Sequence, residues 1–302
     1  MIGNTVALTQ ATSSSVNSAT LYVPLQFWFC RNPGLALPLI ALQYHEVKFN
    51  ISFHPASYCT VGTVTGTPVL GYASLYIDYV YLDTDERRQF AQVQHEYLIE
   101  QLQFTGGESV TATSYKSKLA LNHPCKELVW VIQLDSNVLS GANRWSDYTN
   151  SANSGNNYIG GDVLVDAKLQ LNGQDRFSVR QAPYFNVVQP YQHHTRCPAT
   201  GIYVYSFALN PEQHQPSGSV NMSRIDNATL LLNLNTSAAS QLRVYAVNYN
   251  VLRIMAGMGG LALRLVLMIL EKSVRVSFEK KLASEVSFTL QHFQIDGELL
   301  RA

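Results

Sequence analysis

Charged side chains are scarce in this sequence. Only 14% of its 302 residues are Asp, Glu, Lys or Arg, whereas an average soluble domain has roughly 25%. The 21 basic residues equal the 21 acidic ones, so no net charge draws the chain toward nucleic acid or an anionic membrane. Its 17 tyrosines and 12 phenylalanines suit a chain that buries surface against other chains as well as against itself. Direct binding to nucleic acid is therefore not expected.

The sequence also lacks the motifs of common enzymes. G-x-S-x-G, the P-loop and G-x-G-x-x-G are all absent. The nearest approach to a metal cluster is His193 and His194 together with His214. Adjacent residues of a strand point to opposite faces, so the first two are not expected to bind one ion. We therefore expect no enzyme activity, no cofactor and no metal site.

Cysteines are few and widely spaced. The four of them, Cys30, Cys59, Cys125 and Cys197, form no C-x-x-C pair, which is the usual short-spaced element of a zinc site. Reduced, buried thiols are the expected state.

No apolar run is long enough to predict a membrane-spanning helix. The longest, residues 251–270, is interrupted by Arg253, Arg264 and several glycines, and a spanning helix needs about 20 apolar residues with few charges. A buried strand followed by a tail is the expected structure there.

What the sequence does contain is a series of strand patterns separated by turn-rich loops. Residues 21–30, 43–53 and 73–82 are apolar or alternate with a period of two, as strands require. Further strands are expected at residues 96–104, 109–121, 127–134, 163–171, 202–209, 228–234 and 242–254. Such a series predicts an all-β fold, a jelly roll or another β-sandwich. The long loop at residues 136–162 carries Trp145 and Tyr148, which we expect to be exposed.

The densest charge cluster separates the two groups of strands. Residues 83–89 read DTDERRQ. Asp83 is a candidate N-cap, and Glu86 stands three residues later, where it completes a capping box. The pattern predicts a short helix at a domain boundary.

Several long motifs resemble, in the right order, those of the major capsid proteins of nucleocytoplasmic large DNA viruses, the phycodnavirus and iridovirus group. They are PLQFWFCRNPGLALPLIALQYHEV (residues 24–47), DTDERR (83–88), HEYLIEQ (95–101), YSFAL (205–209) with QPSG (215–218), SRIDNA (223–228) and AVNYNVLR (246–253).

The resemblance implies a double jelly roll in a structural subunit of an icosahedral capsid. Residues 1–82 would be the C-terminal part of the first jelly roll, 83–89 the linking helix, 90–262 the nearly complete second jelly roll, and 263–302 an atypical tail. Only three strand candidates precede the linker, where a jelly roll has about eight strands. The first jelly roll is therefore expected to be incomplete, and the chain to be an N-terminally truncated form.

The resemblance also implies partners and a location. Three copies would form a pseudo-hexagonal capsomer that contacts neighbouring capsomers and minor capsid proteins. The shell would be part of the virion, assembled in the host cytoplasm over an internal membrane that the chain does not span. The architectural residues expected from it are Arg31, Asn32, Pro33 and Gly34 in a turn after a strand, and Asp83, Glu86 and Arg87 at the linker.

A carbohydrate-binding, lectin-like jelly roll is the alternative. In that case, Trp145 and the loop tyrosines would stack on sugars.

Overall fold

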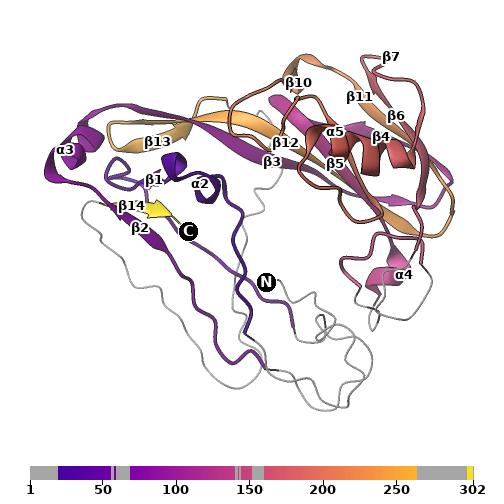
Figure 1. The fold of residues 1–302 in the computed structure, drawn as a ribbon, viewed down its shortest axis with the longest axis horizontal. Helices are drawn as coiled ribbons and strands as arrows, with labels where there is room; N and C mark the ends of the chain where they lie inside the picture. Colours follow the sequence, from indigo (N-terminus) through magenta and orange to yellow (C-terminus); the bar gives the residue numbers. More distant parts are fainter. Residues whose placement is uncertain are drawn as a thin grey trace. The chain divides into compact units, whose positions relative to one another are not determined.

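The computed structural model describes residues 20–55, 58, 69–139, 142, 144–151, 160–263 and 298–301. The chain divides into two compact units (Figure 1). Residues 1–25, 61–63 and 101–249 form the first unit, and residues 26–60, 64–100 and 250–302 form the second. The long strands β3 (His95–Val110) and β12 (Ser240–Met255) contribute residues to both units.

Two antiparallel sheets dominate the structure. The six-stranded sheet has the order β10-β5-β12-β13, with β3 paired to β12 and β9 paired to β5. The five-stranded sheet has the order β4-β11-β6-β7, with β8 paired to β6. The remaining strand bounds are β4 (Ser114–Leu119), β5 (Pro124–Leu134), β6 (Leu164–Leu171), β7 (Gln174–Asp175), β8 (Arg180–Gln181), β9 (Ile202–Ser206), β10 (Val220–Asn221), β11 (Ala228–Leu234) and β13 (Met258–Leu261).

The first unit has one hydrophobic core between its sheets. Trp130 of β5, Leu230 of β11 and Leu242 of β12 are each at most 1% exposed. Buried and partly buried residues alternate along β12 from Ser240 to Val247, while β5 and β11 bury most of their residues. Each strand thus packs an apolar face into the core. The expected strands at residues 127–134, 163–171, 202–209, 228–234 and 242–254 are confirmed to within a few residues. Residues 109–121 are not one strand, because β3 ends at Val110 and β4 begins at Ser114.

A helical segment that the sequence analysis did not predict covers part of this core. The π-helical turn η3 (Tyr184–Val188) runs directly into α5 (Gln189–His193). Phe185 is fully buried and packs edge-on against Trp130, with ring centroids 5.1 Å apart. Shorter helical turns are α4 (Asp135–Val138) and η4 (Met222–Arg224).

The second unit contains fewer regular elements. Its helices are α2 (Trp28–Arg31), η1 (Pro33–Leu35) and α3 (Thr84–Gln92). A three-stranded antiparallel sheet has the order β1-β14-β2, formed by Leu37–Pro38, Glu298–Arg301 and Asp78–Tyr81. A small aromatic cluster centres on Phe29 and Leu37.

Three strand predictions in this region are wrong in whole or in part. Residues 21–27 have no regular structure and 28–31 are helical, residues 43–53 contain a single bridge at Ile51, and only Asp78–Tyr81 of residues 73–82 is a strand. A period-two pattern forms a strand only when another strand pairs with its backbone groups. In the described residues, segments 21–30 and 43–50 have no such partner.

No helix among the described residues is long and apolar enough to cross a membrane. Of the expected tail, the structure describes Leu263 and strand β14, while residues 264–297 and 302 lie outside the described part.

Candidate functional site

The turn at Arg31–Gly34 is held by local bonds and by one ion pair. The Asn32 side chain accepts a hydrogen bond from the Gly34 amide at 2.9 Å, and Pro33 opens η1, where its missing amide hydrogen is not needed. The Arg31 guanidinium donates to the Glu100 carboxylate of β3 at 3.0 Å. The turn follows the helix α2 and not the strand that the sequence predicted, because residues 28–31 close a helical turn.

A helix, α3, forms where the sequence predicted a short one, and its capping box is confirmed. The Asp83 side chain accepts from the Thr84 amide at 2.7 Å, and the Asp83 amide donates to the Glu86 carboxylate at 3.3 Å. The Arg87 amide closes the first turn on the Asp83 carbonyl at 2.8 Å. None of the helix's residues is buried, so its stability depends on these caps and on the favourable position of acids at its N-terminus.

A buried polar network organises the long loop that follows β5. The Arg144 guanidinium donates to Asn137 at 2.7 Å and pairs with the Asp147 carboxylate at 3.3 Å. Asp147 also accepts from the amide and hydroxyl of Thr149 at 3.0 and 2.8 Å. The Gln133 amide of β5 donates to the Trp145 carbonyl at 2.9 Å.

The polar network is the feature that sequence reasoning missed. Its acid and base stand three residues apart, in a stretch rich in Asn, Ser and Asp that reads as an ordinary solvated loop. In the structure the Asp147 side chain is fully buried and that of Arg144 is 8% exposed. Buried charges must be paired and hydrogen-bonded, so this network fixes the described part of the loop against the sheet.

The two loop aromatics differ in exposure. Trp145 is 42% exposed, while Tyr148 is half-buried. The backbone of Tyr148 packs so closely on Gly201 (φ +89°) that a side chain there would overlap the Tyr148 carbonyl. Residues 152–159, the central part of the expected loop, lie outside the described part.

The histidines make separate local contacts. His193 is the last residue of α5, whereas the sequence analysis treated it as a strand residue. Its Nδ1 lies 2.9 Å from the Leu209 carbonyl. The Nε2 atom of His194 lies 2.8 Å from the Glu127 carboxylate of β5. Among the described residues, no three His, Cys, Asp or Glu side chains are grouped so that they could hold a metal ion.

The cysteines correct one expectation. Cys125 is buried, and its burial raises the pKa of the thiol to about 12. Cys30 is half-buried and Cys197 is exposed, so the prediction of buried thiols is wrong for Cys197. Cys59 lies outside the described residues.

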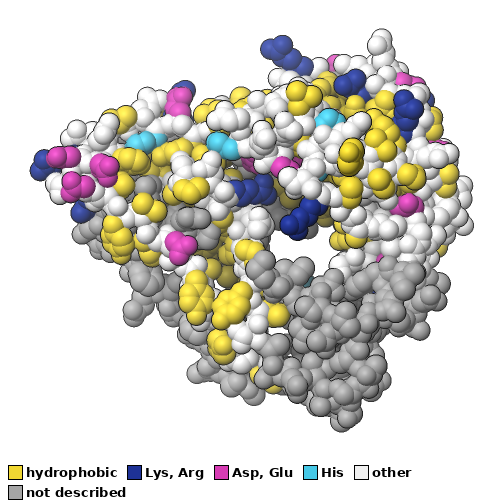
Figure 2. Space-filling view, in the orientation of Figure 1, with side chains coloured by type: hydrophobic (Ala, Val, Ile, Leu, Met, Phe, Trp, Pro, Cys, Tyr) yellow, Lys and Arg dark blue, Asp and Glu magenta, His cyan; other side chains and the backbone are white. Residues whose placement is uncertain are grey.

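Hydrophobic side chains are common on the molecular surface. Figure 2 shows them spread over the visible face, with charged side chains sparse between them. In the second unit the exposed large hydrophobic residues include Tyr44, Val47, Phe53, Tyr58, Val69, Leu70, Tyr72, Tyr76, Val80, Tyr81, Val93, Met255, Met258, Leu261 and Leu263. Exposed apolar surface of this extent is typical of chains that bind other chains.

Two family models match the chain. The family described as "Large eukaryotic DNA virus major capsid protein" matches residues 86–260. The family described as "Major capsid protein N-terminus" matches residues 4–83.

Individual relatives agree with these families. The chain is 47% identical to the major capsid protein of Phaeocystis pouchetii virus, over 83% of this chain and 66% of the relative. It is 51% identical to that of Pyramimonas orientalis virus, over 86% of this chain and 65% of the relative. The chain thus spans slightly less than two thirds of the length of these relatives.

A solved structure shares the fold. A chain of the quasi-atomic model of the PBCV-1 virus capsid superposes with a TM-score of 0.64 at 39% identity, over 81% of this chain and 70% of that one. This likeness confirms the fold class that the sequence predicted, an all-β double jelly roll.

Proposed function

The chain belongs to the major capsid proteins of large eukaryotic DNA viruses, and on this premise we propose that it is a structural subunit of an icosahedral capsid. It acts through shape and surface, with no catalytic step. The observation that supports this most strongly is the β-sandwich shared with the PBCV-1 capsid chain at 39% identity. The low charge and the exposed apolar side chains fit a chain whose surface is covered by other subunits.

The domain organisation we propose follows the sequence boundaries. Residues 1–82 belong to the first jelly roll, 83–89 to the linker, 90–262 to the second jelly roll and 263–302 to a tail. The two family matches, residues 4–83 and 86–260, meet at α3 and support this division. In this proposal Asp83, Glu86 and Arg87 set the path of the chain between the jelly rolls.

The proposed partners are other capsid proteins. Three copies form a capsomer, and capsomers contact one another and minor capsid proteins over an internal membrane. Subunits are assembled in the host cytoplasm and reside in the virion. The Arg31–Gly34 turn keeps α2 close to β3 through the Arg31–Glu100 ion pair, and the loop with Trp145 and Tyr148 faces the capsid exterior. Nothing in the geometry of these two aromatic residues favours the lectin alternative.

A chimera tests this proposal without depending on the length of the chain. Residues 86–260 replace the matching segment of the Phaeocystis pouchetii virus major capsid protein, and the product is measured by size-exclusion chromatography with light scattering. We expect a trimer of the same mass class as the unaltered relative. As a control, the same segment carries Leu230→Asp, which places a charge in the core and should abolish folding and trimer formation. A folded chimera that remains monomeric would contradict the proposal.

A further inference from the structure

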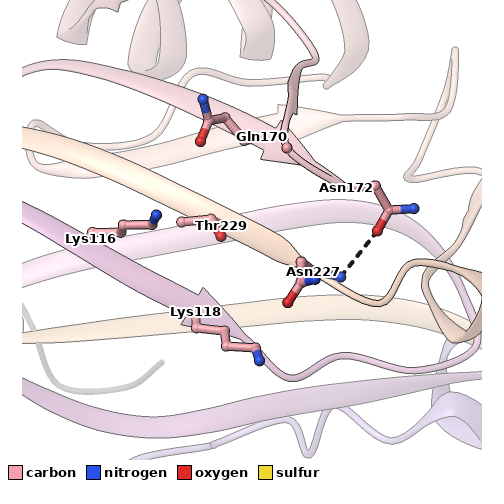
Figure 3. A pocket seen from close by; sticks show the side chains of 7 residues that line it. Lys116, Lys118, Gln170, Asn172, Asn227 and Thr229 are labelled. Carbon is pink, nitrogen blue, oxygen red and sulfur yellow. Dashed lines mark hydrogen bonds between the residues drawn. The ribbon is translucent and has the colours of Figure 1, made fainter.

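A polar depression lies on the outer face of the five-stranded sheet, away from the core. It has a volume of about 400 Å³ and is lined by Lys116, Lys118, Gln170, Asn172, Gly173, Asn227 and Thr229. Lys116 and Lys118 lie on β4, Thr229 on β11 and Gln170 on β6 (Figure 3). Asn172 and Gly173 are in the turn after β6, and Asn227 immediately precedes β11. The volume is within the usual range for small-ligand sites.

The floor of the depression is rigid. Thr229 of β11 is paired with Lys118 on one side and with Gln170 on the other, so the lysine and glutamine stand two strands apart, about 10 Å. The turn after β6 has positive φ at both Asn172 and Gly173, which is the geometry of a tight hairpin. The Asn172 amide donates to the Asn227 carbonyl at 2.7 Å, and the Asn227 amide donates back to the Asn172 side chain at 3.1 Å.

The charges around the depression are unbalanced. Lys116 and Lys118 are exposed, and no carboxylate among the described residues pairs with either ammonium group. No Asp or Glu is among the lining residues. The nearby Asp175 carboxylate accepts hydrogen bonds from the Gln170 amide at 2.6 Å and from the Lys168 ammonium at 3.1 Å. The Gln170 bond, and after it the Lys168 bond, lower the pKa of Asp175.

We propose that this depression binds a tetrahedral oxyanion, a phosphate or sulfate group, either free or esterified to a sugar. Two ammonium groups supply the charge, and the Thr229 hydroxyl and the Asn227 side-chain amide supply neutral hydrogen bonds to the anion and to hydroxyl groups beside it. Single-stranded nucleic acid fits less well, since the lining contains no aromatic side chain on which a base could stack.

The position of β4 offers a competing explanation for the two lysines, Lys116 and Lys118. In the described residues β4 pairs only with β11 and is therefore an edge strand, and lysines on edge strands discourage pairing with other chains. That role needs charge alone. It requires neither the polar lining nor saturable binding of a small anion, so a binding experiment separates the two explanations.

The experiment is isothermal titration of the full chain with inorganic phosphate, inorganic sulfate and a sulfated oligosaccharide at fixed low salt. The variant Lys116→Gln/Lys118→Gln should bind each of them about tenfold more weakly, because it loses two charge-assisted hydrogen bonds. Lys116→Arg/Lys118→Arg should restore binding. The control Lys48→Gln/Arg88→Gln removes two charges from exposed positions in the other unit and should bind like the unaltered chain.

Each outcome has a definite meaning. Saturable binding that only the lysine-to-glutamine pair at 116 and 118 weakens supports the proposal, and displacement of the oligosaccharide by phosphate places both in one site. Binding of phosphate without the oligosaccharide identifies a free anion as the ligand. The proposal is overturned if the unaltered chain shows no saturable binding, if the control weakens binding equally, or if single-stranded DNA binds as tightly as the oligosaccharide and resists phosphate.

Discussion

Arg144 and Asp147 form a buried ion pair, in which the two side chains are 8% and 0% exposed. Replacement of Arg144 by Ala leaves the Asp147 carboxylate buried without its cation. Loss of one partner of a buried pair costs about 3 kcal/mol or more. We therefore expect Arg144→Ala to lower the free energy of unfolding by about that amount, measured by urea denaturation.

The matched control is an exposed ion pair of the same spacing. Arg88 and Asp85 are 74% and 92% exposed and lie 3.6 Å apart on α3. Exposed pairs contribute about 0–1 kcal/mol, so Arg88→Ala should change the stability little. Equal effects of the two substitutions would show that the buried network does not stabilise the loop.

The buried Cys125 and the exposed Cys197 should differ in their reactivity toward thiol reagents. Burial holds the pKa of the Cys125 thiol at about 12, well above its ordinary value, and the thiolate is the reactive form. At pH 8 a thiol reagent should therefore label the exposed Cys197 first and reach Cys125 only after unfolding, as mass spectrometry of peptides can show. Because the pKa of Cys125 is raised in the folded chain, its protonated thiol adds its full contribution to the free energy of unfolding below the ordinary thiol pKa. That contribution declines as the pH rises toward 12. Rapid labelling of Cys125 in the folded chain would contradict its burial.

At the scale of elements, α3 has no buried face and depends on its cap. Asp83→Ala removes the side-chain acceptor and should destabilise the helix by about 1 kcal/mol. Hydrogen exchange of the α3 amides should become faster while exchange in β11 stays unchanged. Asp83→Asn keeps a good capping side chain and serves as the control. If both variants exchange alike, the cap is not what stabilises α3.

The sequence correctly predicted those strands whose apolar residues pack against other strands of the same chain. Strand β11 was predicted with its observed bounds, since its apolar residues are buried between two paired neighbours, β4 and β6. Residues 43–53 have an equally good alternation, yet among the described residues only Ile51 forms a bridge and no strand pairs with residues 43–50. Periodicity reports which face of a segment is apolar, and it does not report what covers that face.

The helix from Tyr184 to His193 was missed because its residues look unfavourable for a helix. Val187 and Val188 are β-branched, and Pro190 lies within the helical run. The π-helical turn that precedes the proline changes the hydrogen-bond pattern at the point where an amide is missing. The candidate sites were only partly predictable for a similar reason. The capping box is local in sequence, while the depression at Thr229 depends on the register of three strands.

At the scale of the whole molecule, the second unit carries many exposed large apolar side chains. Val69, Leu70 and Tyr76 are 82%, 56% and 79% exposed, and such surface favours association with other chains. We expect the 302-residue chain, expressed alone, to bind a hydrophobic dye and to elute above its monomer mass of 33.6 kDa, as measured by chromatography with light scattering.

Substitutions test whether these exposed side chains, and not a general instability of the chain, cause the dye binding and the association. Val69→Ser/Leu70→Ser/Tyr76→Ser should reduce both dye binding and the associated mass, because these side chains contribute little to any described core. Tyr191→Ser removes an equally exposed aromatic side chain, 82% exposed, from α5 of the first unit and tests whether any exposed aromatic has the same effect. A dye-free monomer of 33.6 kDa would mean that the chain covers this surface by itself. Association that the triple variant weakens and Tyr191→Ser does not would locate the contact on the second unit, where a capsid subunit would bury it against its neighbours.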